Sequence, residues 1–262
     1  MGKGEGRKEV SELTNRMGVE ADFAKRLSRL SSRQRRELRE LLGNPPDVRN
    51  VSDADWNRWE EERRRELALI LLAIILASLN QHVGELLPAG QQPSDATRTQ
   101  AYRQALIRAQ AIAAESARSS MQSAKEVVTA SGDLIRTGTA ADVESVLVSA
   151  IGPDRDAVTA ATTTTLAQTE GTNATAIVLE PAGYNLVTRW ITEKDGRVCP
   201  VCRPLHGKVP DLWGLVLDNL VAPGGVRASA EVVKNGGPPA HPNCRCYLRT
   251  QAEPAARRVR VP

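Results

Sequence analysis

The chain has 262 residues, a formal net charge of +4 and a pI near 9.0, so it is long enough for one large domain or two small ones. This charge is too small to indicate nucleic-acid binding by itself. The sequence holds one Phe, three Tyr and four Trp among many Ala, Leu and Val, a composition that favours long packed helices over a compact, aromatic-rich enzyme core.

Residues 1–50 are highly charged, with apolar side chains at helical spacing. Val19, Phe23, Leu27 and Leu30 follow this spacing, which predicts an amphipathic helix. The helix is expected to end at Gly43–Pro46, because proline lacks the backbone donor and restricts the residue before it. The interleaved Arg and Glu residues at 35–40 predict a solvated helix face, and the alternative is a face that contacts nucleic acid.

A second helix is expected from Ser52–Asp55, where acidic side chains favour the positive end of the helix dipole. It runs to about Leu79. Its final stretch, Leu67–Leu79, is apolar all round, which predicts a helix buried on all sides there, in a bundle or at a subunit contact. The stretch is shorter than the roughly 20 residues that span a bilayer. We therefore expect no stable membrane span, and a membrane-inserting segment is the alternative.

The middle of the chain predicts three further helices. The first is capped by Ser94-Asp95 and runs to about Thr129, with alanines every fourth residue from Ala105 to Ala117 forming one face. Residues 131–133 predict a break. A helix at 139–151 and another from 154 to about 180 follow, the latter despite four consecutive threonines, which are β-prone in isolation.

The pattern changes after residue 183. Residues 184–192 alternate as a strand does, 205–209 are expected to form a return strand, and 244–250 to form a last short strand. The predicted fold class is α+β, mainly α: long helices followed by a small β-containing zinc-knuckle unit. The expected organisation is a helical attachment region at 1–90, a module at 94–250 that is helical over 94–180 and holds the β and zinc unit at 184–250, and a flexible basic tail at 251–262.

All four cysteines lie in this C-terminal region. Cys199 and Cys202 have the spacing of a zinc knuckle, and His241, Cys244 and Cys246 form a second group. Structural zinc takes four ligands, so five candidates compete for four places. We expect Zn²⁺ to supply much of the folding free energy of a unit that has little apolar core. Two disulfides are the alternative.

A catalytic metal is less favoured. Zinc deaminases need a His-X-Glu before the cysteine pair, and none precedes Cys199. His206, His241 and Asn243 resemble parts of an HNH nuclease set, but no His-His or Asp-His pair accompanies them. The expectation is therefore a protein that is not an enzyme, with a zinc-knuckle nuclease or another DNA-acting enzyme as the alternative.

Several motifs together resemble the Mu F-like head morphogenesis, or minor head protein, family of tailed bacteriophages. They are Thr169-Glu170 followed by Asn173, Trp190 with Thr192, Asp195–Cys202 (DGRVCPVC), Leu205–Gly207 (LHG) and Pro238–Cys246 (PPAHPNCRC). The resemblance extends from about Ala96 to Leu248, and its C-terminal part is the most specific.

The resemblance implies a structural virion protein of the phage head at the portal vertex, present in the host cytoplasm during assembly. The partners it implies are the portal protein and the major capsid or scaffold protein, with DNA as a further partner during genome packaging or ejection. It also implies that the cysteine and histidine cluster binds zinc.

Overall fold

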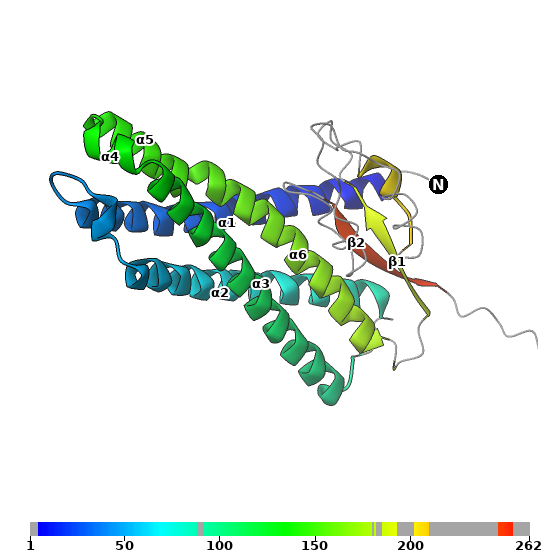
Figure 1. The fold of residues 1–262 in the computed structure, drawn as a ribbon. Coiled ribbons are helices and arrows are strands. Elements are labelled where there is room, and N and C mark those ends of the chain that lie inside the picture. Colours follow the sequence, from blue (N-terminus) through cyan, green and yellow to red (C-terminus); the bar gives the residue numbers. More distant parts are fainter. Residues whose placement is uncertain are drawn as a thin grey trace, which may run out of the picture. The chain divides into compact units, whose positions relative to one another are not determined.

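The computed structural model describes residues 5–87, 92–179, 181, 185–192, 202–209 and 246–253, with residues 5–17 described by their backbone. This part of the chain is mostly helical and ends in a small antiparallel sheet (Figure 1). The predicted mainly-α class is thereby confirmed. Two compact units are formed, one from residues 1–71 and 110–164 and the other from residues 72–109 and 165–262.

The elements follow the chain in a simple order. The helices are α1 (Glu5–Leu42), α2 (Asp53–Leu86), α3 (Asp95–Ala130), α4 (Gly132–Thr137), α5 (Ala140–Ala150) and α6 (Pro153–Leu179). The strands are β1 (Asn185–Ile191) and β2 (Tyr247–Glu253), and the short 3₁₀ helices are η1 (Val48–Asn50) and η3 (Arg203–Leu205).

The helix ends are set by local capping. Ser52 and Asp55 cap α2 reciprocally, each backbone N–H donating to the other's side chain at 3.1 and 3.3 Å. Ser94 caps α3 by accepting from the Thr97 N–H at 3.2 Å. Gly43, after the last residue of α1, has φ +80, a conformation that glycine adopts at little cost.

The break predicted at residues 131–133 is confirmed at Ser131, which separates the end of α3 at Ala130 from the next helix. A short helix, α4, begins at Gly132, and it is followed by α5 after a single extended residue pair. Thr139 caps α5 through a capping box with Asp142. The Ser-Gly-Asp sequence starts a helix here because Asp133 lies in the first turn, where its charge favours the helix dipole.

Unit 1 (residues 1–71 and 110–164) is built on one apolar cluster. It gathers side chains from α1, α2, α3, α4 and α5, namely Leu38, Leu42, Trp56, Trp59, Met121, Ala124, Val128, Ile135, Val143, Val146, Leu147, Ala150 and Ile151. Trp56 and Trp59 meet edge to face with ring centroids 5.2 Å apart. The alanine face predicted on α3 is buried at every fourth position, as small side chains allow close packing.

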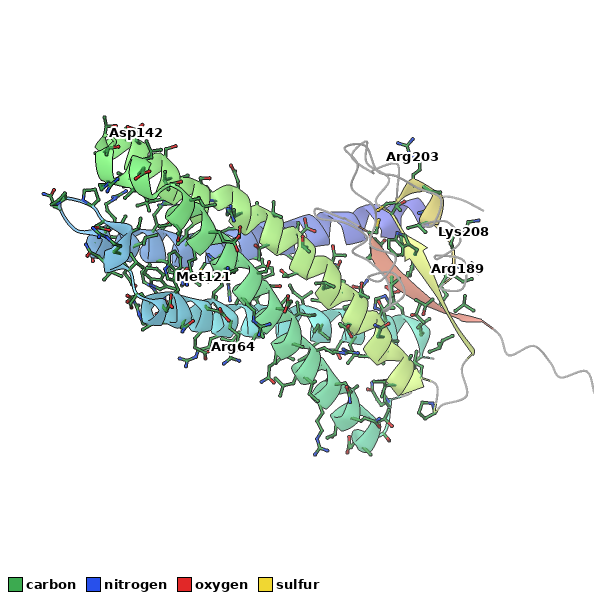
Figure 2. All side chains as sticks on the ribbon, viewed as in Figure 1. Arg64, Met121, Asp142, Arg189, Arg203 and Lys208 are labelled. Atoms are coloured by element: carbon green, nitrogen blue, oxygen red, sulfur yellow. The ribbon has the colours of Figure 1, made fainter. Side chains whose placement is uncertain are left out.

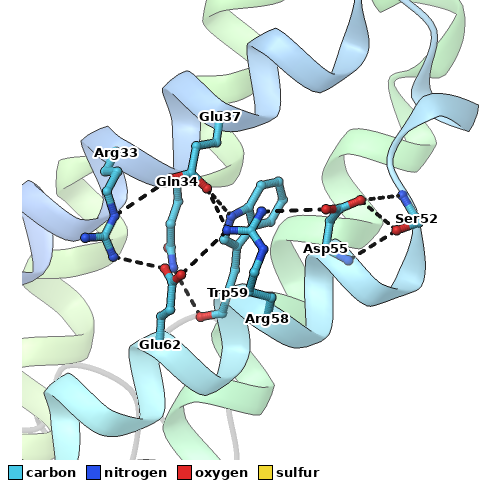
Figure 3. A network of polar contacts seen from close by, with 8 residues as sticks. All are labelled: Arg33, Gln34, Glu37, Ser52, Asp55, Arg58, Trp59 and Glu62. Carbon is cyan, nitrogen blue, oxygen red and sulfur yellow. Dashed lines mark hydrogen bonds and ion pairs between the residues drawn. The ribbon is translucent and has the colours of Figure 1, made fainter.

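A polar network joins α1 to α2 beside this cluster (Figure 3). The Trp59 indole N–H donates to Glu37 at 2.9 Å, and Gln34 donates to the Trp59 carbonyl at 3.1 Å. The indole bond, with Arg58 and Arg33 nearby, holds the pKa of Glu37 below its ordinary value. The predicted solvated Arg/Glu face is therefore in part an interhelical contact.

A buried ion pair ties three helices of unit 1 together. Arg63 of α2 donates to Asp156 of α6 at 3.1 Å and to the Ser31 hydroxyl of α1 at 2.5 Å, while Ser31 donates to Asp156 at 2.8 Å. Arg63 and Asp156 are each 1% exposed. Among the described residues, Arg63 Nε and Asp156 Oδ2 meet no hydrogen-bond partner.

Burial dominates the electrostatics of this pair. Desolvation raises the pKa of Asp156, and the charge of Arg63 with the hydrogen bonds from Ser31 and Arg63 opposes that rise. Desolvation likewise lowers the pKa of Arg63. A carboxyl whose folded pKa is raised holds its proton more tightly in the folded protein, so its ionisation costs stability as the pH rises. Arg63 offsets that cost.

Unit 2 (residues 72–109 and 165–262) brings α2 and α6 into close contact. A Cβ on Gly171 of α6 would lie 2.5 Å from the Ser78 Cβ and 2.8 Å from the Ile75 carbonyl oxygen of α2. The Ser78 hydroxyl donates to the Gln168 carbonyl at 3.3 Å. The apolar core of this unit consists of Leu79, Ala101, Ala174, Val178 and Leu179, with Leu76, Val83, Leu86, Leu87 and Leu186 packed against it.

The composition of Leu67–Leu79 predicted burial on all sides. This prediction is wrong, because one side of the stretch is exposed. Leu67, Leu71 and Ile75 are fully buried, whereas Leu69 is 68% exposed. Within the described residues, α2 is the one helix with the length and apolar composition to cross a membrane, and 28% of its most apolar window is buried. A core helix of a soluble protein passes the same test, because composition does not record which side faces the core.

We predict that the Arg63–Asp156 pair fixes the packing of α6 more than it adds stability. Asp156→Leu leaves a buried unpaired guanidinium and should lower the free energy of unfolding by about 3–5 kcal/mol. The double variant Arg63→Met/Asp156→Leu should regain most of this lost stability, because no unpaired charge is left. In Arg63→Met the pKa of Asp156 should rise further, so stability should fall as the pH rises above about 4. Chemical denaturation at several pH values measures both effects.

The matched control is Glu115→Leu/Arg118→Met, a pair whose side chains are 74% and 64% exposed. This exposed pair should change stability by less than about 1 kcal/mol. Wild-type stability in Asp156→Leu would contradict the prediction.

Candidate metal-binding unit

The sheet of unit 2 presents one buried face. β1 and β2 pair antiparallel, with Trp190 opposite Leu248 and Thr188 opposite Thr250. Directly opposed residues project to the same side, and Trp190, Leu248 and Thr250 are all buried. The predicted first strand is confirmed, and the last strand begins three residues later than expected, at Tyr247.

A threonine of α6 anchors this sheet. The Thr172 hydroxyl lies 3.0 Å from the Leu248 carbonyl and 3.1 Å from the Gln168 carbonyl of its own helix, and it donates toward both. Thr172 is 1% exposed. On the sheet itself, the hydroxyls of Thr188 and Thr250 lie 2.9 Å apart and join the two strands on their buried face.

The return strand predicted at 205–209 does not form. The chain turns through η3 instead, with Gly207 at φ +75. Two backbone hydrogen bonds still join this turn to β1. The Gly207 N–H donates to the Trp190 carbonyl at 2.7 Å, and the Trp190 N–H donates to the Lys208 carbonyl at 2.9 Å. Gly207 explains the difference, because its φ of +75 lies outside the extended region that a strand needs.

His206 holds the end of β1. The Thr192 backbone N–H donates to His206 Nδ1 at 3.2 Å, and the Thr192 hydroxyl lies 3.0 Å from the same atom. An N–H can only donate, so Nδ1 is the unprotonated nitrogen and the proton of the neutral ring is on Nε2. A neutral imidazole binds a metal through its unprotonated nitrogen. That nitrogen is occupied here, so His206 serves as a positioning residue.

Two of the five candidate ligands lie in the described residues. Cys202 precedes η3 and is 2% exposed, and Cys246 precedes β2 and is 3% exposed. Continuing the β1–β2 register places Thr192 opposite Cys246, on the face that carries Trp190 and Leu248. Cys199, His241 and Cys244 lie outside the described residues, as does the predicted turn at Asp195-Gly196.

The two described thiols suit a soft metal ion. Both are buried, which favours a closed structural site over an open catalytic one. Arg203 follows Cys202 directly in the sequence, and Figure 2 shows Arg189, Arg203 and Lys208 in the region of β1 and η3. Arg189 donates to the Gly207 carbonyl at 3.1 Å. Positive charge here can offset thiolates. Within the described residues no group of three or more His, Cys, Asp or Glu side chains is gathered.

Sequence reasoning missed Thr172 and the role of His206. Threonines are β-prone in isolation, yet those of α6 lie in a helix. The hydroxyls of Thr163 and Thr175 donate to the carbonyls four residues earlier in the same helix, at 2.6 and 3.0 Å. This bonding satisfies a buried hydroxyl inside a helix. The packing of α6 against β2 decides which threonine also bonds to a strand. The local sequence gives no signal that distinguishes this threonine from the others.

One comparison with known proteins gives a match. The family model described as phage Mu protein F like protein matches residues 89–249, and the chain belongs to this family. This family indicates a phage head morphogenesis protein, a class of structural proteins. The suspected family is thereby confirmed. No curated protein matches the chain, and no solved structure matches it.

We predict that Thr172→Val loosens the sheet. The substitution keeps the shape of the side chain and removes the hydroxyl that reaches Leu248, so the free energy of unfolding should fall by about 1 kcal/mol. Amide exchange in Tyr247–Glu253 should accelerate by about fivefold. The control is Thr175→Val, since the Thr175 hydroxyl bonds the Gly171 carbonyl of its own helix. Equal exchange in β2 for both variants would refute the anchoring role.

Proposed function

We propose that this protein is a minor head protein that binds the portal and the major capsid or scaffold protein during head assembly. Its place would then be the portal vertex of the virion, with a period in the host cytoplasm before assembly. Membership of the phage head morphogenesis family supports this role at the level of the class. The observation that carries the finer proposal is the exposed apolar side of α2.

The exposed side of α2 is suited to protein attachment. Leu69 is 68% exposed in a helix whose opposite side is fully buried. Ala73 and Ala77 follow it at helical spacing and are also exposed. Small residues beside a large apolar one let another helix approach closely, and a large apolar side chain supplies burial at the centre of an interface. A head protein that is held by its helices would use such a surface.

Co-expression with the portal, capsid and scaffold proteins of the same phage tests the proposal. The wild-type chain should co-purify with the portal protein. Leu69→Gln should weaken this association about tenfold to a hundredfold, because full burial of a leucine contributes about 1.5–3 kcal/mol.

The control for this test is Leu134→Gln, which changes a 47% exposed leucine on α4. Leu134→Gln should leave the association unchanged. If the wild-type chain associates with none of the portal, capsid and scaffold proteins, the proposed role is wrong.

We further propose that Zn²⁺ holds the C-terminal unit together as a structural ion. Its ligands would come from Cys199, Cys202, His241, Cys244 and Cys246. Support comes from the two described thiols, which are buried beside the sheet, and from the small core around them. A bound ion would supply folding free energy that the apolar side chains of such a unit do not.

Metal analysis of the purified protein tests the zinc proposal. We expect about one zinc per chain, lost in Cys202→Ser and in Cys246→Ser, and the same measurement on Cys199→Ser, His241→Ala and Cys244→Ser selects the remaining ligands. His206→Gln is the matched control and should keep its zinc, because His206 Nδ1 accepts from Thr192. A zinc-free wild-type protein would overturn the proposal.

A further inference from the structure

The solvent side of α1 carries a strongly basic face. It is formed by Lys25, Arg26, Arg29, Arg33 and Arg36, all of them exposed. At 3.6 residues per turn these five side chains occupy an arc of about 100° and a length of about 17 Å. Asp22 and Glu40 are the exposed acidic residues at its two ends. We call these five residues the basic face.

Most of this charge is not neutralised within the protein. Arg33 pairs with Glu62 of α2 at 3.0 Å and lies 3.9 Å from Glu37 (Figure 3). Lys25, Arg26, Arg29 and Arg36 form no ion pair with any residue that the structure describes. Elsewhere in unit 1, by contrast, Arg118 and Arg136 each pair with an acid three residues earlier.

The border of the face with α2 is acidic and accounts for the pairing of Arg33. Arg26, Arg29, Leu30, Arg33, Glu62 and Glu66 line a cleft of about 430 Å³ there. The two carboxylates lie on the α2 side of this cleft. Arg26, Arg29 and Arg33 border this cleft, whereas Lys25 and Arg36 of the basic face are not part of its lining.

The composition of the face indicates what binds it. Protein interfaces need large apolar or aromatic anchors at their centre. The exposed large apolar side chains of the described residues lie on α2, α3, α4, α5 and α6, and residues 18–42 of α1 have none. A nucleic-acid backbone needs cations alone. Four of the five cations are arginines, which bind phosphate oxygens through two parallel hydrogen bonds.

We infer that the basic face of α1 binds the phosphate backbone of duplex DNA without sequence preference. Single-stranded nucleic acid is bound by aromatic side chains that stack on the bases, and no aromatic side chain is exposed on the described part of α1. The contact goes beyond the proposed attachment to the portal and lies outside the family match, which begins at residue 89. A protein near the point of DNA entry would thereby touch the genome itself.

The affinity should depend on salt in a defined way. The logarithm of the binding constant falls with the logarithm of the salt concentration, with a slope of about −0.9 for each phosphate neutralised. Four available cations predict a slope of about −3.5. Binding should therefore weaken about a hundredfold between 50 and 200 mM salt.

Fluorescence anisotropy with a short labelled DNA duplex and the purified full chain tests the inference. Lys25→Gln/Arg29→Gln/Arg36→Gln should weaken binding at least about tenfold at low salt and make the salt slope shallower by about three. These three residues are exposed, so circular dichroism should show an unchanged fold.

The matched control is Arg98→Gln/Arg118→Gln/Arg136→Gln. It removes the same three charges from positions that pair with Asp95, Glu115 and Asp133, and it should bind DNA as the wild type does, within about twofold.

Three results would overturn the inference: no duplex binding by the wild type at 50 mM salt, equal losses in the two triple variants, or equal affinity for polyglutamate and duplex DNA. The measurement contains no portal, capsid or scaffold protein, so its outcome is separate from that of the portal experiment.

Discussion

The buried Arg63–Asp156 pair is the constraint on which unit 1 depends. Two charges that are each 1% exposed must meet each other, because either one alone would lie in a low-dielectric interior without compensation. Ser31 completes the arrangement by accepting from one partner and donating to the other. One residue from each of α1, α2 and α6 is thereby fixed. The hydrogen bonds of this triad are directional, whereas the apolar contacts around it are not.

The sheet of unit 2 is held by polar contacts in a comparable way. The polar contacts that place its two strands are the Thr172 hydroxyl, the paired hydroxyls of Thr188 and Thr250, and the bond from Thr192 to His206. Such contacts orient a small unit without giving it much stability. A structural metal ion at the buried cysteines would supply folding free energy that the small apolar core does not. The small core therefore supports the zinc proposal.

Several features could be predicted because their causes are local. The capping residues Ser52 and Ser94, the stop at Gly43 and the alternation of β1 act within a few residues, so the starts of α2 and α3, the end of α1 and the bounds of β1 follow from the sequence. The end of α2 does not, because the helix continues beyond the predicted Leu79 to Leu86. The errors arose where a partner segment decides. The 205–209 turn bonds β1 without forming a strand, and the short helix α4 lies between the confirmed break at Ser131 and the predicted helix at 139–151. Of the predicted metal ligands, Cys202 and Cys246 are described, and their burial is compatible with the prediction without testing it.

The sequence by itself determined the helical class, the family and the cysteine spacing, since composition, periodicity and motifs are properties of neighbouring residues. The tertiary structure alone decided which charges are buried and which are free. Arg63 and Arg29 are both arginines in charged helical stretches, yet one is fully buried against Asp156 and the other is exposed on the basic face. A net charge of +4 gave no indication of that face. It emerges only when acids such as Glu37 and Glu62 turn toward neighbouring helices, because pairing removes their charge from the solvent side.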